Sequence, residues 1–267
     1  MRESIPPTAY ESNRRLIVGP PSSERSLRMF PPNEVRVWRA RVGRQPAGWL
    51  PLATGTLSEE ERARQARFVR ERDAELFALG RAMLRRVLAA SMDVAPRAVT
   101  FEAGPFGKPR LAAAHRAPFR FNPTHSGDLA VVAITVGREV GVDVEAVRPL
   151  KDLEGLVRAT FSAREQRDIL AAPEAGRLAS FFAAWARKEA VVKALGHGLR
   201  FPLDAFDVEV SPEAPPALLA SREAALVPSA WIMHALPPMA GYASALAVER
   251  AMNSAVTCEE WTCAASP

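Results

Sequence analysis

The residues VGVDVEAV at positions 140–147 show where a strand must run and which of its faces is polar. Successive side chains of a strand point to opposite faces, so Val142 and Val144 share one face while Asp143 and Glu145 share the other. The two carboxylates then lie about 7 Å apart along the strand, which lets their oxygens converge on a hard cation such as Mg²⁺. A strand with one solvated face would show the same pattern, so this stretch alone leaves both interpretations open.

Further elements are predicted on both sides of this stretch. Apolar alternation and apolar runs predict strands over 35–42, 98–104, 128–135, 206–210, 230–236 and 242–249. N-capping residues and apolar periodicity predict helices that begin after Ser58, Asp73 and Ser162 and a helix across 177–195. This order predicts an α+β fold of two similar halves, 35–139 and 140–250, rather than a doubly wound parallel sheet. We expect the proline-rich residues 1–34 to form a disordered extension and 251–267 to form a loosely ordered tail.

Composition narrows the class of protein. The chain has 267 residues and a formal net charge of +5, which favours an anionic partner such as nucleic acid, a phosphorylated cofactor or an acidic protein. Its two cysteines, Cys258 and Cys263, exclude a disulfide framework and a cysteine-rich zinc site. The N-terminus lacks the apolar segment of a signal peptide, and no stretch approaches the ~18 apolar residues of a membrane span. We therefore expect a cytoplasmic protein without a membrane partner.

The predicted helix across 177–195 carries a polar stripe. Trp185, Glu189 and Lys193 recur every four residues and therefore share one face, with Lys188 beside them. A carboxylate between two lysines suits a metal–pyrophosphate site, although Glu189 and Lys193 alone also describe a common surface pair. Glu165, in contrast, is explained by the capping box that it forms with Ser162.

Two further residues lie where a phosphate could bind. Lys108 is predicted on a turn (GKPRL, 107–111), and His125 just before a strand (FNPTHSGD, 121–128). Each could bind phosphate together with nearby backbone N–H groups, and each alone could equally be an ordinary turn residue.

These stretches occur in an order that resembles a known family. The sequence is similar to 4′-phosphopantetheinyl transferases of the Sfp type over roughly residues 48–249, through the motifs G-K-P-x-L (107–111), F-N-x-[ST]-H-S (121–126), G-[VI]-D-[VI]-E (141–145), F-S-x-x-E (161–165) and W-x-x-K-E-x-x-x-K (185–193).

The resemblance implies two α+β halves related by pseudo-twofold symmetry, with the active site in the cleft between them. It implies transfer of 4′-phosphopantetheine from coenzyme A to a serine of an apo acyl or peptidyl carrier protein, with release of 3′,5′-ADP. The resemblance implies carriers of polyketide and nonribosomal peptide biosynthesis. The implied enzyme is a monomeric holo-[acyl-carrier-protein] synthase that depends on Mg²⁺ and does not act on nucleic acid.

The resemblance also assigns roles to residues. Asp143, Glu145 and Glu189 would hold Mg²⁺ against the coenzyme A pyrophosphate, and Lys188 and Lys193 would neutralise charge on the phosphates. Either Glu189 or a metal-bound water would take the proton of the carrier serine.

Other positions match contacts to the nucleotide end of coenzyme A. These are Lys108, Thr124 and His125, with Arg81 as a ligand of the 3′-phosphate and Arg64 as a weaker one. Thr124 replaces the usual serine and keeps the hydroxyl. Acidic and arginine residues around 61–64 replace lysines that are common in the family, which makes the phosphate contacts of that helix the least secure.

Three alternatives stay open. The basic charge is compatible with a nucleic-acid binder, but the arginines over 62–86 lie among many acidic residues and no nucleic-acid-binding motif is present. A metal-dependent phosphohydrolase could use the same three carboxylates without an acceptor protein. A non-catalytic family member is the third alternative, and the complete set of carboxylates argues against it.

Overall fold

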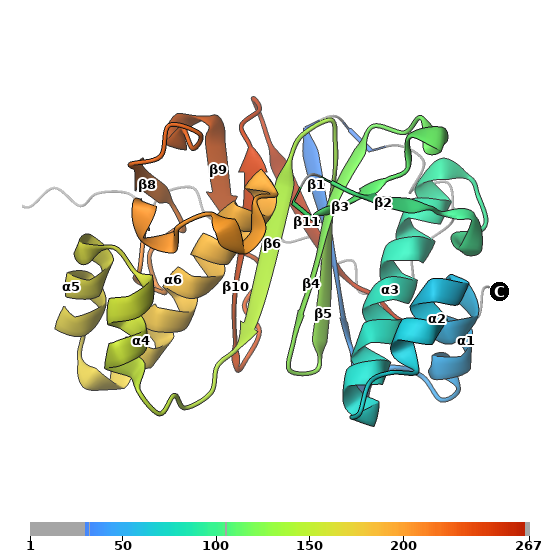
Figure 1. Cartoon of the computed structure of the whole chain (residues 1–267), viewed down its shortest axis with the longest axis horizontal. Coiled ribbons are helices and arrows are strands. Elements are labelled where there is room, and N and C mark those ends of the chain that lie inside the picture. Colours follow the sequence, from blue (N-terminus) through green and yellow to red (C-terminus); the bar gives the residue numbers. More distant parts are fainter. Residues whose placement is uncertain (1–29, 32, 105, 265–267) are drawn as a thin grey trace, which may run out of the picture.

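The computed structural model describes residues 30–31, 33–104 and 106–264 (Figure 1). Most of the predicted extension, 1–34, lies outside the described residues. Within it, the ring of Phe30 packs against Trp38 with centroids 6.1 Å apart, and the first strand begins at Glu34.

Helices and strands both contribute, which confirms the predicted α+β class. The strands are β1 (Glu34–Arg41), β2 (Phe101–Ala103), β3 (Pro109–Leu111), β4 (Phe119–Ser126), β5 (Leu129–Val136), β6 (Val140–Ala146), β7 (Phe206–Val208), β8 (Leu218–Ser221), β9 (Trp231–His234), β10 (Tyr242–Glu249) and β11 (Ala255–Glu260). The helices are α1 (Trp49–Thr56), α2 (Glu59–Gln65), α3 (Glu71–Met92), α4 (Leu153–Thr160), α5 (Ala163–Ala171) and α6 (Glu174–Leu195). Helix α3 begins two residues before the predicted cap Asp73.

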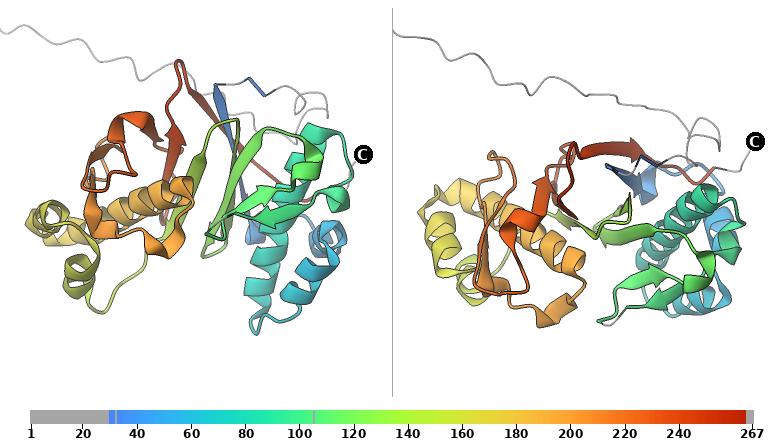
Figure 2. Two further views of the ribbon diagram at one scale, coloured as in Figure 1. Left: turned by 45° about the horizontal axis from the view of Figure 1, so that its top comes forward. Right: turned by 90° about the horizontal axis from the view of Figure 1, so that it is seen from above.

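Two sheets lie between two long helices. One sheet has the strand order β11-β1-β5-β4 and packs against α3, and the other has the order β6-β10-β9 and packs against α6. Figure 2 shows α3 on one side of these two sheets and α6 on the other, with α4 and α5 beyond α6. Each half thus has one long helix on a small sheet, and the pseudo-twofold relation between the halves stays a prediction.

The inner faces of the two sheets form a shared core. Val35 and Val37 of β1 pack there with Val142 and Val144 of β6, and all four are at most 1% exposed. The opposite face of β6 is covered as well, because α6 packs against it and Asp143 is only 2% exposed. The interpretation of this strand as one with a solvated face is therefore wrong.

His125 precedes the predicted strand, β5, as expected, but it also lies within a strand that was not predicted. It belongs to β4, whose ladder with β5 places His125 opposite Ala130. The sequence around it contains Pro123, which is tolerated because β4 is at the edge of its sheet. Pairing with β5 stabilises this strand, and the pattern of residues within 119–126 does not reveal that pairing.

The tail, 251–267, is more ordered than predicted within its described residues. Strand β11 pairs in parallel with β1, from Glu34 opposite Ala255 to Arg39 opposite Glu260. The physical reason lies in the hydrogen-bonding groups of β1. One edge of β1 pairs with β5, and β11 pairs with the backbone N–H and C=O groups of the other edge. Beyond β11, Trp261 and Cys263 are buried in the core under α3.

Within the described part of the chain, no helix combines the length and apolar character needed to cross a membrane.

Candidate active site at the junction of the two halves

The two sheets meet where β4 runs beside β6. Hydrogen bonds from the backbone of β6 to side chains of β4 join the two strands there. Asn122 Oδ1 accepts a hydrogen bond from the N–H of Val142 at 2.9 Å, and Ser126 Oγ accepts one from the N–H of Ala146 at 3.0 Å. Both acceptors lie on the same face of β4, and Thr124 lies between them. These bonds fix the register of β4 against β6 and bring Thr124 beside Asp143.

Gly141 sets how closely α6 approaches β6. A Cβ atom at this position would lie 2.0 Å from the carbonyl oxygen of Ala190 and 2.3 Å from the backbone nitrogen of Ala194. Only glycine therefore permits this backbone contact. The close approach brings Glu189 and Lys193 of α6 over Asp143 and Glu145, which share a face of β6 with Gly141.

Asp143 and Lys193 form the centre of the site. Lys193 Nζ donates to Asp143 Oδ1 at 2.5 Å and to Thr124 Oγ1 at 3.0 Å, and Thr124 Oγ1 lies 3.2 Å from the same carboxylate oxygen. The second oxygen, Oδ2, is buried and has no hydrogen-bond partner among the described residues. Burial raises the pKa of Asp143 to about 7, against the opposing effect of Lys193.

Glu145 is held from two sides. Its Oε2 accepts from the hydroxyl of Ser126 at 3.1 Å, and its Oε1 accepts from the indole N–H of Trp185 at 3.2 Å. The Trp185 ring stacks on Phe181 with centroids 5.9 Å apart, which fixes the indole. Burial and the charge of Glu145 raise the pKa of Glu189, while Lys193 opposes that shift. The three carboxylates therefore lie close enough to influence one another.

The chemistry of these carboxylates fits a hard divalent cation. Carboxylate oxygens are the protein ligands that Mg²⁺ prefers, and the buried Asp143 Oδ2 has no partner in the described part of the chain. Burial, with a smaller contribution from mutual repulsion, raises the pKa values of Asp143 and Glu189 against the opposing charge of Lys193. No three His, Cys, Asp or Glu side chains of the described residues are already gathered as a coordination group. The metal site stays a prediction.

His125 and Arg64 border this cluster on the side of the first half. The His125 side chain is exposed and alternates with Thr124, so it faces away from β6. Partial burial and the positive charges of Lys193 and Arg64 lower the pKa of His125, which favours the neutral imidazole. Arg64 is exposed, and its guanidinium lies 5.2 Å from the centroid of the Phe77 ring.

Lys188 does not join the cluster, contrary to its predicted place beside Lys193. Neighbouring residues of a helix point about 100° apart, and Lys188 points from α6 towards α5 and β7. Its Nζ is 2.8 Å from Glu165, 2.6 Å from the carbonyl oxygen of Leu203 and 2.5 Å from that of Phe206. The side chain is completely buried, and these contacts use all three of its protons.

Glu165 completes this buried pair. The predicted capping box is present, because Ser162 Oγ accepts from the N–H of Glu165 and Glu165 accepts from the N–H of Ser162. Its other oxygen accepts from the N–H of Val208 at 2.8 Å. Glu165 and Lys188 thus stabilise the packing of α5, α6 and β7.

Two other predicted phosphate ligands already have protein partners. Lys108 Nζ donates to Glu139 at 2.7 Å and to the carbonyl oxygens of Val140 and Ala194 at 3.0 Å each. It therefore connects the start of β3 to β6 and to the last turn of α6. Arg81 forms an ion pair with Glu61, and its Nε lies 2.6 Å from that carboxylate.

Sequence reasoning did not single out Ser126 or Asn122 as site residues. Both belong to the F-N-x-[ST]-H-S motif, and the period-two spacing of Asn122, Thr124 and Ser126 is the signal that places them on one strand face.

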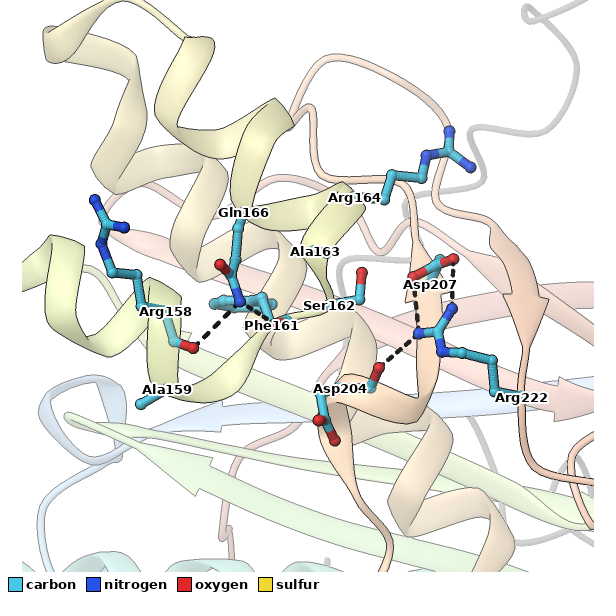
Figure 3. A pocket seen from close by; sticks show the side chains of 10 residues that line it. All are labelled: Arg158, Ala159, Phe161, Ser162, Ala163, Arg164, Gln166, Asp204, Asp207 and Arg222. Carbon is cyan, nitrogen blue, oxygen red and sulfur yellow. Dashed lines mark hydrogen bonds and ion pairs between the residues drawn. The ribbon is translucent and has the colours of Figure 1, made fainter.

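A separate cavity of about 310 Å³ lies in the second half (Figure 3). It is lined by residues of α4, α5 and the β7–β8 region, and it contains none of the predicted site residues. Its arginines have acidic partners: Arg158 pairs with Glu154, Arg164 with Asp168 and Arg222 with Asp207. Arg222 also donates to the carbonyl oxygen of Asp204 at 2.5 Å. The cavity therefore offers little uncompensated charge to a ligand.

Comparisons with known proteins match both halves of the chain. A model of the 4′-phosphopantetheinyl transferase superfamily matches residues 139–247, and a model described as 4′-phosphopantetheinyl transferase, N-terminal, matches residues 45–137.

Individual relatives carry the same description. 4′-Phosphopantetheinyl transferase HetI of Nostoc sp. is 33% identical over 225 residues, which cover 82% of this chain and 91% of that protein. A phosphopantetheinyl transferase of Thraustochytrium sp. is 31% identical and covers 71% of this chain and 70% of that protein. The L-aminoadipate-semialdehyde dehydrogenase-phosphopantetheinyl transferase of Xenopus laevis is 33% identical over 62% of this chain, which spans 58% of that relative.

Proposed function

This chain belongs to the 4′-phosphopantetheinyl transferase superfamily, and we propose that it moves 4′-phosphopantetheine from coenzyme A to a serine of an apo acyl or peptidyl carrier protein. The other product is 3′,5′-ADP. The observation that carries this proposal is the buried Asp143, with one oxygen that has no partner among residues 30–31, 33–104 and 106–264 and with Lys193 at 2.5 Å from the other. A cluster of carboxylates with an adjacent ammonium group suits a pyrophosphate that arrives with a divalent cation.

Lys193 binds the pyrophosphate in this proposal. Its ammonium group has three protons, of which Asp143 and Thr124 accept two, and its side chain is 29% exposed. The remaining proton is open to a phosphate oxygen. Such a fixed positive charge stabilises the negative charge that develops on the leaving phosphate.

Asp143, Glu145 and Glu189 would hold Mg²⁺, which when bound supplies further positive charge against the pyrophosphate. Ser126 and Trp185 keep the Glu145 carboxylate oriented, each through one hydrogen bond.

Glu189 is our candidate for the base that accepts the serine proton. Burial raises its pKa, which brings the carboxylate closer to the working pH and makes it a better proton acceptor. The serine oxygen forms a bond to the phosphorus that carries pantetheine. The bond between that phosphorus and the bridging oxygen of 3′,5′-ADP breaks, and the leaving phosphate keeps the electron pair.

The direct test is to mix the protein with coenzyme A, Mg²⁺ and apo carrier domains, and to weigh the carriers by mass spectrometry. The expected result is a gain of one phosphopantetheine group and loss of this gain in Glu189→Gln. Glu174→Gln, an exposed carboxylate of the same helix, is the matched control and should retain full activity.

Two outcomes would contradict the proposal. One is the absence of any mass gain on both acyl and peptidyl carriers. The other is hydrolysis of coenzyme A at the same rate with and without a carrier, which would indicate a phosphohydrolase.

A further inference from the structure

The loop between α2 and α3, residues 66–70, exposes apolar side chains beside the candidate site. Every residue of this loop is exposed, and Val69 is 99% exposed, so its side chain makes almost no contact with the rest of the protein. Phe68 is 36% exposed and packs on Phe77, with ring centroids 5.4 Å apart. The loop is therefore anchored by Phe68 and presents Val69 to solvent.

Four arginines that form no ion pair within the described part of the chain surround Val69. Arg67 and Arg70 flank Phe68 and Val69, and Arg64 and Arg72 lie at either end. Among the described residues none of the four takes part in an ion pair, whereas the exposed Arg158 of α4 does. Their side-chain contacts within the described part of the chain are a 3.4 Å bond from Arg67 Nε to the carbonyl oxygen of Ala63 and the ring contact of Arg64.

The positive charge is confined to one segment. Between Arg64 and Asp73 the chain has four arginines and two carboxylates, Glu71 and Asp73, which leaves an excess of two positive charges on exposed side chains, with Glu59, Glu60 and Glu75 just outside the segment. This makes the loop attractive to a carboxylate-rich surface.

The loop lies close to the strand that carries part of the candidate site. It leads into α3, which packs against β4, and β4 contains Thr124 and His125. The charges of Arg64, Asp73 and Lys193 all act on the side chain of His125, so these residues are near it. Figure 1 shows α3 beside the sheet that contains β4 and β5, with α2 on the far side of α3.

The shape of the loop favours a macromolecule over a small ligand. Small molecules bind in concave sites, whereas all residues from 66 to 73 are exposed. Single-stranded nucleic acid is bound by aromatic rings on which bases stack, and here the only aromatic ring of the loop already packs on Phe77. A projecting aliphatic side chain inside a ring of arginines suits a protein surface with an apolar depression surrounded by carboxylates.

We propose that the α2–α3 loop docks the protein substrate, with Val69 in an apolar depression of the carrier domain and Arg67, Arg70 and Arg72 against its carboxylates. The inference rests on the proposed function, because it names the surface that receives the acceptor of that reaction.

The test is steady-state kinetics with coenzyme A and an apo carrier domain that the wild-type protein modifies. Arg67→Glu combined with Arg70→Glu, and separately Val69→Ser, should each raise the KM for the carrier about tenfold or more, while kcat and the KM for coenzyme A stay within about twofold. Arg167→Glu, an exposed arginine of α5 without an ion pair among the described residues, is the matched control and should change none of these.

Salt gives a second, independent readout. The KM for the carrier should rise with ionic strength in the wild-type protein, and this dependence should be much weaker in the double charge reversal. Thermal unfolding of every variant should match the wild type, because the substituted side chains are on the surface.

The possible failures are distinguishable. A wild-type protein that modifies no carrier overturns the proposed function itself. An active wild type with an unchanged KM for the carrier in both variants overturns only the docking inference. The docking inference is also overturned by a rise in the KM for coenzyme A alone, or by loss of binding to a single-stranded oligonucleotide with no effect on the carrier.

Discussion

Gly141→Ala should damage the active site without touching any group that takes part in the chemistry. The new Cβ would lie 2.0 Å from the carbonyl oxygen of Ala190 and 2.9 Å from the Cα of Ala194, both in the backbone of α6. Neither atom belongs to a flexible side chain that could turn away. The helix must therefore separate from β6.

The size of the effect follows from that separation. Normal contact distances exceed 3 Å, so α6 has to move by about 1 Å or more. Overpacking of this kind costs about 1–3 kcal/mol of unfolding free energy. A displacement of about 1 Å between Glu189 and Asp143 should lower kcat/KM by about 10²-fold.

The assay combines carrier modification, followed by mass spectrometry, with urea unfolding. The matched control is Gly176→Ala in the first turns of the same helix, where an added Cβ meets no atom within 4 Å. This control should leave activity unchanged and stabilise the protein slightly, because alanine is a better helix former than glycine. A Gly141→Ala protein with wild-type activity and stability would refute the proposed role of the close contact.

Three other predictions concern single side chains of β6 and α6. The unfolding free energy of the metal-free protein should fall by about 2–3 kcal/mol from pH 5 to pH 8. Burial raises the pKa of Asp143 to about 7 in the folded protein, whereas the unfolded chain releases that proton near 3.8. Urea unfolding of Asp143→Asn should lack this pH dependence. Lys188→Met should lower the unfolding free energy by about 3–5 kcal/mol, because it leaves Glu165 buried and unpaired, and the added change Glu165→Gln should restore much of that stability. Unchanged stability together with a raised KM for coenzyme A would contradict this prediction. Trp185→Phe keeps an aromatic ring but removes the N–H donated to Glu145, so the Mg²⁺ concentration for half-maximal activity should rise about tenfold; an unchanged Mg²⁺ requirement would contradict it.

Local patterns predicted the elements that depend on local physics. The capping boxes at Ser58 and Ser162 begin helices as expected, because both partners of each box lie within four residues of sequence. Strand β10 matches the predicted stretch 242–249. Strand β4 was not predicted, because its stretch contains Asn122 and Pro123 and its stability comes from pairing with β5.

The same contrast between local and distant interactions applies to the residues of the candidate site. Period-two spacing placed Asp143 and Glu145 on one face of β6, and helical spacing placed Glu189 and Lys193 on one stripe of α6. Lys188 was misplaced because a motif gives residue order but not the direction of each side chain, and the acceptors of Lys188 come from a distant segment, Leu203–Phe206. The partners of Lys108 are likewise distant in sequence, so no local pattern could reveal them.

The pairing of β11 with β1 has a consequence for biosynthesis. Val37 lies opposite Cys258, a contact that closes a loop of about 220 residues. The core under α3 also includes Trp261 and Cys263, so the first half to leave the ribosome cannot be completed until the second has been made. In the meantime the open edge of β1 is a template for pairing with another nascent chain. The protein is thus most exposed to misassembly during translation, and a chaperone that shields β1 should raise its yield.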